Sequence, residues 1–509
     1  MPPKPYFYRQ GGSFYQIQTE ARFDFRGGRN STDVPDNLLP TELVDSTNAR
    51  VTPFGAIEKR TGSQRINTTG LGAAINGLFQ WFAPSGLQTV AIAGGFIYYR
   101  GVGFGDFTQV DPGPTNRFST TVNAHFAPFR ANTSGAPLRL YISSGGRVYV
   151  WDGTAISRID GTNSVPSATL IEPYHTRIFA NDVNFPQFIF WSGVGIPDNF
   201  IPSTQIAGGS AMVDVLHGDA INATEIVGAS LLIATKESVV RFTGYSANDI
   251  QIAQDTAGVS ADIGIVGDNA LLRVEQVAFG MTVKGPYAVM EAGMVPVGIW
   301  VENDFDGMDR TVINNVTIGH HHGRREVWFA YAGVSDAGLN KHVLVYNLRN
   351  QRWYGPFVYP FGIKQLTYYE DVNGDKWLIA GCNDGFVRHM DSGALDDILA
   401  NGTGGSGYTM TVEFAPIFFS GPGYQKTLRN FFLQSNLPVG HATVLKYAFD
   451  DKSLTTHTFT DVGNSALTLN YRARITNTGR RLRLQIVDTS ATVPFYGGFV
   501  VEAYHRERP

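Results

Sequence analysis

Short hydrophobic strands that end in a turn recur along this chain at a nearly regular interval. In each one, apolar and aromatic residues run for a few positions and are followed by Gly, Asn or Asp, which is typical of a β-strand that enters a turn. Seven such segments occur, about 40 to 57 residues apart, the size of one four-stranded blade of a β-propeller. They are residues 96–101, 147–153, 188–193, 239–244, 287–293, 342–347 and 386–391. Because a blade buries its faces only against neighbouring blades, this recurrence predicts a closed ring with a central channel.

The local patterns divide the chain into four parts. Residues 73–400 carry the recurring strands and are expected to form seven blades, with six or eight as alternatives. Residues 401–407, Asn-Gly-Thr-Gly-Gly-Ser-Gly, are expected to form a flexible hinge. Residues 408–509 alternate apolar and polar positions over long strands, which predicts a separate β-sandwich. Residues 1–72 are rich in Gly, Pro and Asn and are expected to form an extended segment beside the propeller.

Helical patterns are scarce. Residues 41–49 are the best candidate for a helix, because Thr41 can cap it and acidic residues follow in the first turn. A second short helix is expected at residues 395–400. The rest favours strands, so the sequence predicts an all-β protein: a β-propeller with an extended N-terminal segment and a C-terminal β-sandwich.

Composition narrows the classes of function. The net charge of −4 argues against a dedicated nucleic-acid-binding protein, which would carry a basic stripe. The single cysteine, Cys382, excludes an internal disulfide framework and is expected to be a small buried hydrophobe. The chain has neither a secretion-signal pattern nor an apolar stretch of about 18 residues. We therefore expect synthesis in a cytosol and no membrane anchor.

Two polar motifs could bind a metal ion. Asp371-Val372-Asn373-Gly374-Asp375 has the spacing of a calcium loop, but Cys382 stands where the loop's bidentate Glu belongs. Asn373-Gly374 between two hydrophobic strands is also a strong hairpin signal, so a hairpin is favoured and calcium stays an alternative. The same two alternatives, a turn or a calcium site, apply to the acidic turn at residues 304–309. Residues 320–322 are three histidines, but adjacent residues of a strand point to opposite faces, which favours a polar hairpin over a metal site.

No sequence signature of catalysis is present. A nucleophile elbow, a His-Glu-x-x-His helix and a phosphate-binding loop are all missing, as are the turns that mark sialidase-type propellers. The carboxylate pairs at residues 396–397 and 450–451 lie in polar turns, where solvation explains them. We therefore expect no enzyme activity, no catalytic residue, no metal and no cofactor.

The N-terminal region carries a second pattern. Gly27-Gly28 and Asn30 precede the candidate helix, and residues 55–62 then read Gly-Ala-Ile-Glu-Lys-Arg-Thr-Gly. Further along, residues 325–331 read Arg-Glu-Val-Trp-Phe-Ala-Tyr, followed by Val345-Tyr346-Asn347 and Trp353. Residues 478–484 read Thr-Gly-Arg-Arg-Leu-Arg-Leu. These short patterns cover nearly the whole chain, and they resemble the tail nozzle and packaged-DNA stabilisation proteins of short-tailed bacteriophages, the tail tubular protein B-like propellers.

The resemblance implies a structural virion protein of the phage tail, made in the host cytoplasm. It implies a homohexameric ring under the portal and adaptor, in contact with tail fibres or spikes. Genomic double-stranded DNA would be retained by this ring and pass through it during ejection, without sequence recognition. The alternative is a carbohydrate-binding or carbohydrate-cleaving propeller, such as a receptor-binding protein or depolymerase, whose aromatic side chains would stack on sugars.

Two groups of basic residues are candidates for assembly contacts. Lys59 and Arg60 lie between Gly55 and Gly62, either at a solvated hairpin tip or against a neighbouring subunit or DNA phosphates. Arg472 and Arg474 share one strand face, and Arg481 and Arg483 share another. These four either form a solvated outer face or bind a partner such as a spike, a fibre or a neighbouring subunit.

The acidic turns are candidates for the wall or gate of the DNA channel. Each Lys or Arg contact with phosphate would add affinity and slow ejection, so a channel of low friction should be neutral or acidic. Five residues are proposed to line or gate it: Asp304, Asp306, Asp309, Asp371 and Asp375.

Overall fold

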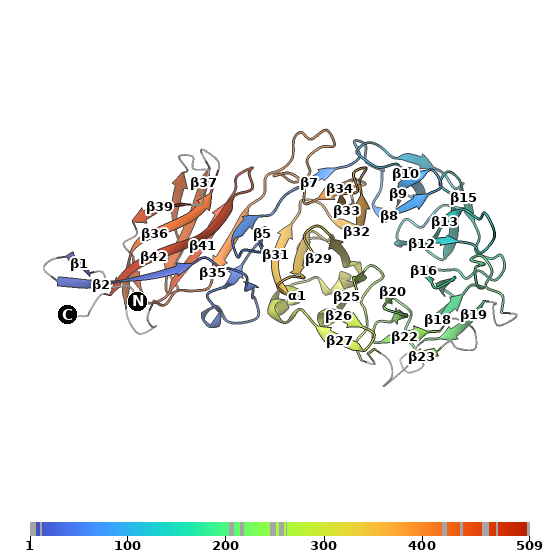
Figure 1. The fold of residues 1–509 in the computed structure, drawn as a ribbon, viewed down its shortest axis with the longest axis horizontal. Helices are drawn as coiled ribbons and strands as arrows, with labels where there is room; N and C mark the ends of the chain where they lie inside the picture. The colour runs from blue at the N-terminus through green and yellow to red at the C-terminus, as the bar shows by residue number, and fades with distance from the viewer. Residues whose placement is uncertain are drawn as a thin grey trace.

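The computed structural model describes residues 7–10, 13–202, 208–213, 218–244, 251–253, 259–260, 262–419, 425–437, 441–460, 468–474 and 477–505. Figure 1 shows two modules side by side, a ring of small sheets and a pair of larger packed sheets. The ring is a β-propeller and the pair of sheets is a β-sandwich, so the predicted all-β class is confirmed.

The ring contains seven four-stranded antiparallel sheets within the described residues. The first sheet is β8 (Ile75–Ala83), β9 (Gly86–Ala93), β10 (Phe96–Arg100) and β11 (Thr108–Val110). The second is β12 (Ala124–Arg130), β13 (Leu138–Ser144), β14 (Arg147–Trp151) and β15 (Ile156–Arg158). The third is β16 (Ile171–Tyr174), β17 (Arg177–Asp182), β18 (Phe185–Trp191) and β19 (Gly209–Met212). The fourth is β20 (Ala223–Val227), β21 (Ser230–Ala234), β22 (Val239–Thr243) and β23 (Gln251–Ala253).

The remaining three sheets complete the circle. The fifth is β24 (Leu271–Val274), β25 (Val277–Thr282), β26 (Gly285–Met290) and β27 (Gly293–Pro296). The sixth is β28 (Thr317–His321), β29 (Glu326–Tyr331), β30 (His342–Asn347) and β31 (Arg352–Val358). The seventh is β32 (Ile363–Glu370), β33 (Lys376–Cys382), β34 (Val387–Met390) and β7 (Ser63–Arg65).

Each of the seven recurring segments forms the third strand of its sheet. These strands are β10, β14, β18, β22, β26, β30 and β34. Their apolar residues are buried between adjacent sheets, as Ile97, Trp151 and Phe242 illustrate. The hydrophobic recurrence therefore marks the repeating unit of the fold.

The ring closes through its innermost strands and through one N-terminal strand. The first strand of each sheet contacts the first strand of the next, and β32 contacts β8, so these seven strands surround the channel. The seventh sheet takes its outer strand β7 from a part of the chain that precedes the first sheet. The N-terminal segment is thus a component of the propeller as well as its neighbour.

The sandwich also combines both ends of the chain. Its eight-stranded sheet contains β1 (Phe7–Gln10), β2 (Ser13–Arg22), β5 (Ala49–Val51), β6 (Ile57–Lys59), β36 (Lys426–Asn436), β39 (Thr468–Arg474), β40 (Thr478–Gly479) and β42 (Phe495–His505). Its six-stranded sheet contains β3 (Gly28–Arg29), β4 (Glu42–Asp45), β35 (Met410–Phe414), β37 (Ala442–Phe449), β38 (Thr455–Thr460) and β41 (Leu482–Asp488). A shared core between the sheets includes Leu43, Phe414 and Phe499. The sandwich therefore extends beyond the predicted residues 408–509.

The two predicted helices are wrong. Residues 41–49 contain β4 and the start of β5, because Leu43 faces the sandwich core and pairs with Phe414 of β35. The Glu42 carboxylate accepts a hydrogen bond from the Leu39 backbone N–H, so the apparent helix cap closes a turn before a strand. Residues 395–400 form turns and isolated bridges to neighbouring segments.

Helix is confined to short segments in the described residues. They are α1 (Glu302–Asp306) and the 3-10 turns η1 (Pro35–Asn37), η3 (Ile299–Val301) and η4 (Arg310–Asn315). None of these described helices is long and apolar enough to cross a membrane.

Candidate functional site

The junction between propeller and sandwich is built around buried ion pairs. Arg60 follows β6, and its guanidinium donates to both carboxylate oxygens of Asp396, at 2.8 and 2.5 Å. It also donates to the backbone carbonyl of Val358 at the end of β31, and it lies 3.8 Å from the Tyr408 ring centroid. Arg60 and Asp396 are fully buried. One side chain therefore ties the sixth propeller sheet to the connection that leads into the sandwich.

Lys59 points into the sandwich from the adjacent position. Its ammonium lies 3.3 Å from the Asp488 carboxylate, and both side chains are fully buried. Asp488 also accepts hydrogen bonds from the Tyr496 hydroxyl and pairs with His441. Burial opposes ionisation of Asp488, but the His441 and Ser490 hydrogen bonds outweigh it and lower its pKa to about 2. The carboxylate therefore stays charged and holds the lysine.

Arg50 of β5 forms the third buried centre. Its guanidinium pairs with Asp391, which ends the seventh recurring segment, and with Glu326 at the start of β29. Burial alone would raise the Asp391 pKa, but the charge of Arg50 and the hydrogen bond from His321 hold it well below its usual range. Glu326 accepts further hydrogen bonds from Trp328 and Tyr354. The sixth and seventh sheets are thus fixed to an N-terminal strand of the sandwich.

A fourth contact joins α1, which connects the fifth and sixth sheets, to the N-terminal part of the sandwich. Asp304 of α1 accepts hydrogen bonds from Arg29 of β3 at 2.8 and 2.7 Å and from Ser31 at 2.8 Å. Arg29 also pairs with Asp45 of β4. Asp304 therefore belongs to the junction between the modules.

Glycines let the backbones at this junction approach closely. A Cβ atom at Gly62 would lie 1.7 Å from the Leu395 carbonyl oxygen, and one at Gly27 would lie 2.6 Å from the Thr41 oxygen. Gly28 and Gly55 have positive φ angles of 70° and 86°, which favour glycine. These positions require glycine for space or for backbone conformation.

Lys59 and Arg60, predicted as exposed assembly residues, are placed in the interior. They form neither a solvated hairpin tip nor a surface for a neighbouring subunit or DNA, because Asp488 and Asp396 enclose them. The sequence pattern could not predict that each would pair with a carboxylate far away in the sequence.

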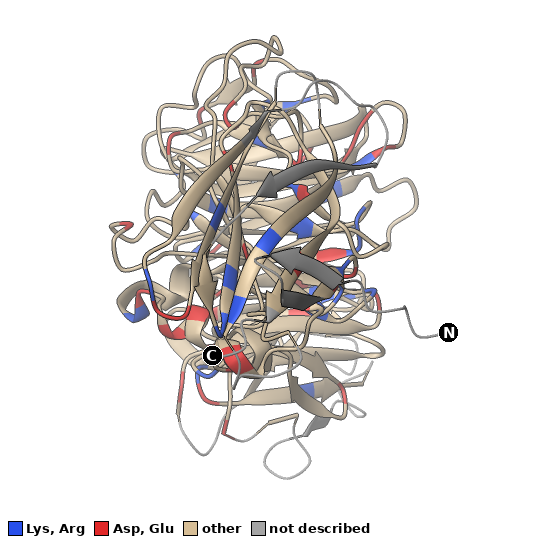
Figure 2. Ribbon diagram, turned by 90° about the vertical axis from the view of Figure 1, so that its left-hand side faces the viewer, with Lys and Arg blue, Asp and Glu red and all other residues tan. Residues whose placement is uncertain are grey.

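The C-terminal arginines have different positions. Arg481 pairs with Asp36 at 2.6 Å and with Asp451 at 3.3 Å, and Arg483 pairs with Glu413 of β35 at 2.8 Å. All three pairs are accessible at least in part, and the pair of Arg483 with Glu413 joins two strands of the sandwich, β41 and β35. The side chains of Arg472 and Arg474 lie outside the described residues. Figure 2 shows blue basic and red acidic segments scattered over the ribbon.

The propeller channel is crossed by side chains from opposite sheets. His125 of β12 lies 3.3 Å from Asp268, which precedes β24, and Asn123 donates to the same carboxylate at 2.8 Å. Burial disfavours the charge on Asp268, but His125 and Asn123 outweigh this effect and lower its pKa. Because the second and fifth sheets lie across the ring from each other, this bridge spans the channel. A DNA duplex cannot pass between groups at hydrogen-bonding distance.

Two glutamates lie on adjacent inner strands. Glu172 belongs to β16 and Glu225 to β20, and Glu225 accepts a hydrogen bond from the Arg273 backbone N–H at 3.0 Å. Burial raises the pKa of both groups, and for Glu225 the value is about 7. These side chains and the His125–Asp268 bridge were not predicted. Their only sequence signal is the presence of ionisable residues within first strands.

The other acidic lumen candidates form local turns. The Asp309 carboxylate accepts from Thr311 at the start of η4, and Asp306 pairs with Arg310 on the surface. Asp371 accepts from the backbone N–H groups of Asn373 and Asp375, both at 2.8 Å, which forms the predicted hairpin between β32 and β33. That these turns line or gate a DNA channel stays a prediction.

Other predicted features have local explanations. No group of three or more His, Cys, Asp or Glu in the described part of the chain is arranged to hold a metal ion. His321 pairs with Asp391, while the rings of His320 and His322 contact each other. Cys382 is buried in the core as predicted, and burial raises its pKa to about 11.

Acid should act on the seventh sheet through His389. Its ring stacks on Trp377, and burial lowers its pKa to about 4 despite the nearby Asp391. The folded pKa is below the ordinary value of about 6.5, so stability is lost as pH falls from about 6.5 to 4. Glu225 acts in the opposite direction, because its raised pKa favours the folded state at lower pH. His389→Phe keeps a ring stacked on Trp377 but cannot be protonated. We therefore expect the free energy of unfolding of the wild type to fall more than that of His389→Phe between about pH 6.5 and 4.

The measurement is the midpoint of urea unfolding from pH 7.5 to 4. The wild type should lose more stability on acidification than His389→Phe, whereas His175→Gln, in an exposed turn, should follow the wild type. Parallel pH profiles for wild type and His389→Phe would show that this histidine does not titrate as described.

Several solved structures resemble this chain at low sequence identity. No protein-family model and no curated protein matches this chain. The structure of BBS1N in complex with ARL6DN is 12% identical, covering 63% of this chain and 94% of that chain, with a TM-score of 0.40. The Cps50 (Swd1) β-propeller domain of Myceliophteria thermophila is 10% identical, covering 66% and 99%, with a TM-score of 0.37. The extracellular domain of a hybrid two-component system from B. thetaiotaomicron is 10% identical, covering 90% and 61%, with a TM-score of 0.43.

Proposed function

We propose that this chain is a structural protein of the tail of a short-tailed phage, where copies form the nozzle ring. The observation that supports this proposal is the place of the residues that resemble the nozzle family. Five of them, Gly28, Lys59, Arg60, Gly62 and Glu326, lie at the junction of propeller and sandwich. Gly27, Asn30 and Gly55 contact other residues of the N-terminal segment. The other matches lie elsewhere: Val345–Asn347 belong to β30 of the sixth sheet, and residues 478–484 run from β40 into β41 of the sandwich.

The junction suits a subunit of a closed ring. Head-to-tail contacts in a ring use two different surfaces on each subunit, held in a fixed relation. Buried ion pairs tie the sandwich to the fifth, sixth and seventh propeller sheets, so the two modules form one body with a surface on each. The outer parts of propeller and sandwich are therefore our candidates for the two ring contacts.

The bridged propeller channel determines where DNA would pass. His125, Asn123 and Asp268 close the ring's own centre. In the proposed nozzle, packaged DNA is therefore conducted along an axis shared by several copies, which we propose to be six, below the adaptor and portal and beside fibres or spikes.

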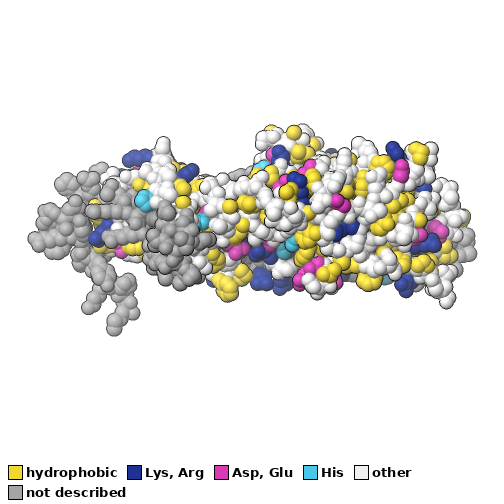
Figure 3. All heavy atoms as spheres, turned by 90° about the horizontal axis from the view of Figure 1, so that it is seen from above, with side chains coloured by type: hydrophobic (Ala, Val, Ile, Leu, Met, Phe, Trp, Pro, Cys, Tyr) yellow, Lys and Arg dark blue, Asp and Glu magenta, His cyan; other side chains and the backbone are white. Residues whose placement is uncertain are grey.

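Binding of purified protein to duplex DNA should be weak. Acidic, basic and apolar side chains are intermixed on the face seen in Figure 3, without a large area of one charge. Few phosphate contacts would then form, and we expect a dissociation constant no tighter than about 10⁻⁴–10⁻⁶ M at physiological salt. Fluorescence anisotropy with a labelled duplex measures this constant between 50 and 200 mM salt. Tight binding with a steep salt dependence would contradict a conduit of low friction.

The functional test is retention of DNA in particles. Particles assembled without this chain should package DNA and then lose it, so the fraction of genome digested by added nuclease should rise. Complementation with the wild-type chain should restore protection. Particles that keep their DNA and infect normally without the chain would contradict the proposal.

A further inference from the structure

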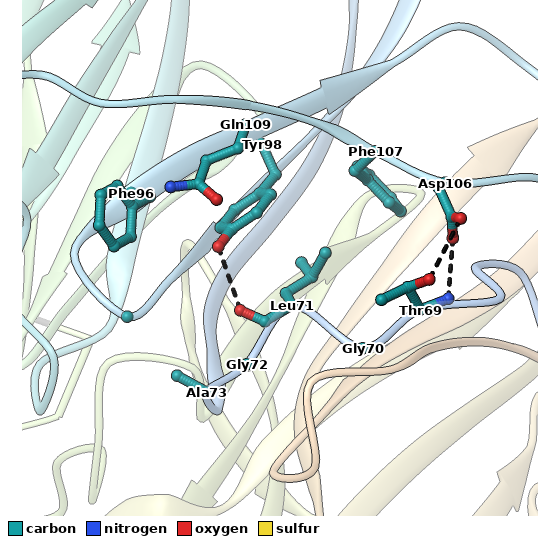
Figure 4. Close-up of a pocket in the computed structure, with 11 residues that line it drawn as sticks. Thr69, Gly70, Leu71, Gly72, Ala73, Phe96, Tyr98, Asp106, Phe107 and Gln109 are labelled. Carbon is teal, nitrogen blue, oxygen red and sulfur yellow. Dashed lines mark hydrogen bonds between the residues drawn. The ribbon is translucent and has the colours of Figure 1, made fainter.

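A cleft lies on the first propeller sheet, away from the junction and the channel bridge. It has a volume of about 560 Å³, within the usual range for small-molecule sites. Strands β10 and β11 form one side, and the connection from β7 to β8, through Gly70 and Gly72, forms the other (Figure 4).

Three aromatic side chains line this cleft: Phe96, Tyr98 and Phe107. Tyr98 is held in place because its hydroxyl donates to the Leu71 carbonyl at 3.1 Å. Phe96 and Phe107 keep part of their surface accessible. The cleft thus offers apolar ring surfaces in a fixed arrangement.

The lining offers no free charge to a ligand. It contains no Lys, Arg or His, and its carboxylate, Asp106, already accepts hydrogen bonds from the backbone N–H groups and hydroxyls of Thr68 and Thr69. A carboxylate with two such partners on each oxygen is satisfied.

Two guanidinium groups lie on the aromatic rings, Arg117 at 4.6 Å from the Phe96 ring centroid and Arg100 at 5.5 Å from that of Phe107. Arg117 pairs with Asp111, and Arg100 donates to the Gly101 and Gly105 carbonyls, so an anion would find only cations that are already paired. A cation would have to break the Asp106 loop contact.

Gln109 supplies a neutral polar side chain that is available to a ligand in the cleft. Its side chain is exposed, and its amide has no hydrogen bond within the described part of the chain. An amide can both donate and accept, so it can bind a hydroxyl in either sense. Figure 4 shows this amide between Phe96 and Tyr98, over the cleft.

We propose that this cleft binds a neutral sugar ring of a glycan. A hexose presents apolar C–H faces to aromatic rings and hydroxyls to neutral polar groups, which matches Phe96, Phe107 and Gln109. This inference does not depend on the nozzle function, since the cleft lies within one subunit.

The test is saturation-transfer NMR of the full chain with glucose, galactose, mannose, N-acetylglucosamine and glucuronate. At least one neutral sugar should bind with a dissociation constant of about 1 mM, and glucuronate should bind more weakly. Gln109→Met keeps the length of an exposed side chain, and Phe107→Ala removes one wall; each should weaken binding at least tenfold. Phe82→Ala, at an exposed aromatic residue of β8 outside the cleft, is the matched control and should bind as wild type.

Three results would overturn the proposal. They are no saturable binding at concentrations about tenfold above 1 mM, equal binding by all variants, and a preference for glucuronate. Ring assembly and DNA retention are measured separately, so a failure of sugar binding is distinguishable from a failure of the nozzle function.

Discussion

Arg60→Met should lower the free energy of unfolding by about 3–5 kcal/mol, because it leaves the buried Asp396 carboxylate without its partner. The guanidinium also donates to Asn48 and to the Val358 carbonyl, so further buried acceptors lose their donor. The loss should be visible as a lower urea midpoint, followed by tryptophan fluorescence, and as faster proteolysis in residues 401–407.

Two further variants identify the cause. Arg26→Met breaks an exposed pair with Asp24 and should cost no more than about 1 kcal/mol. Arg60→Met combined with Asp396→Leu removes both buried charges and should recover part of the lost stability. If Arg60→Met is no more harmful than Arg26→Met, the ion pair does not hold the modules together.

Gly62→Ala should also destabilise the folded protein, although it adds only one methyl group. Its Cβ would lie 1.7 Å from the Leu395 carbonyl oxygen, so the backbone that leads into β7 must move. Overpacking of this kind costs about 1–3 kcal/mol or more. Since β7 is the outer strand of the seventh sheet, we expect ring closure to weaken, with early hydrogen exchange in β34.

Gly407→Ala is the control for this prediction. No atom lies within 4 Å of a Cβ at Gly407, and its φ is outside the positive range, so the change should be neutral or slightly stabilising. Equal stability and equal exchange in β34 for the two alanine variants would contradict the role assigned to Gly62.

The propeller could be predicted because each of its repeating strand-and-turn units is specified by residues that are neighbours in the sequence. A hydrophobic strand followed by a turn is visible in a few residues, and all seven such segments became third strands. The supposed helix at residues 41–49 failed because β4 is fixed by Phe414 of β35, far away in sequence. Tertiary strand pairing therefore determined the structure of residues 41–49, against the local preference for a helix cap.

The site could be predicted only in part. Residues 55–62 were recognised as important, but a Lys-Arg pair between glycines looks exposed until its partners are known. Those partners, Asp396 and Asp488, lie more than 300 residues away. The channel residues His125 and Asp268 come from different sheets, so their contact follows from ring closure and from no local pattern.

The most direct test of the proposed nozzle is the copy number and symmetry of this chain in the phage tail. Single-particle electron cryomicroscopy of intact particles should show six copies of the 55.6 kDa chain around the tail axis, with DNA on that axis and outside every propeller channel. One copy or three copies around the axis, or DNA threaded through a propeller, would contradict the account.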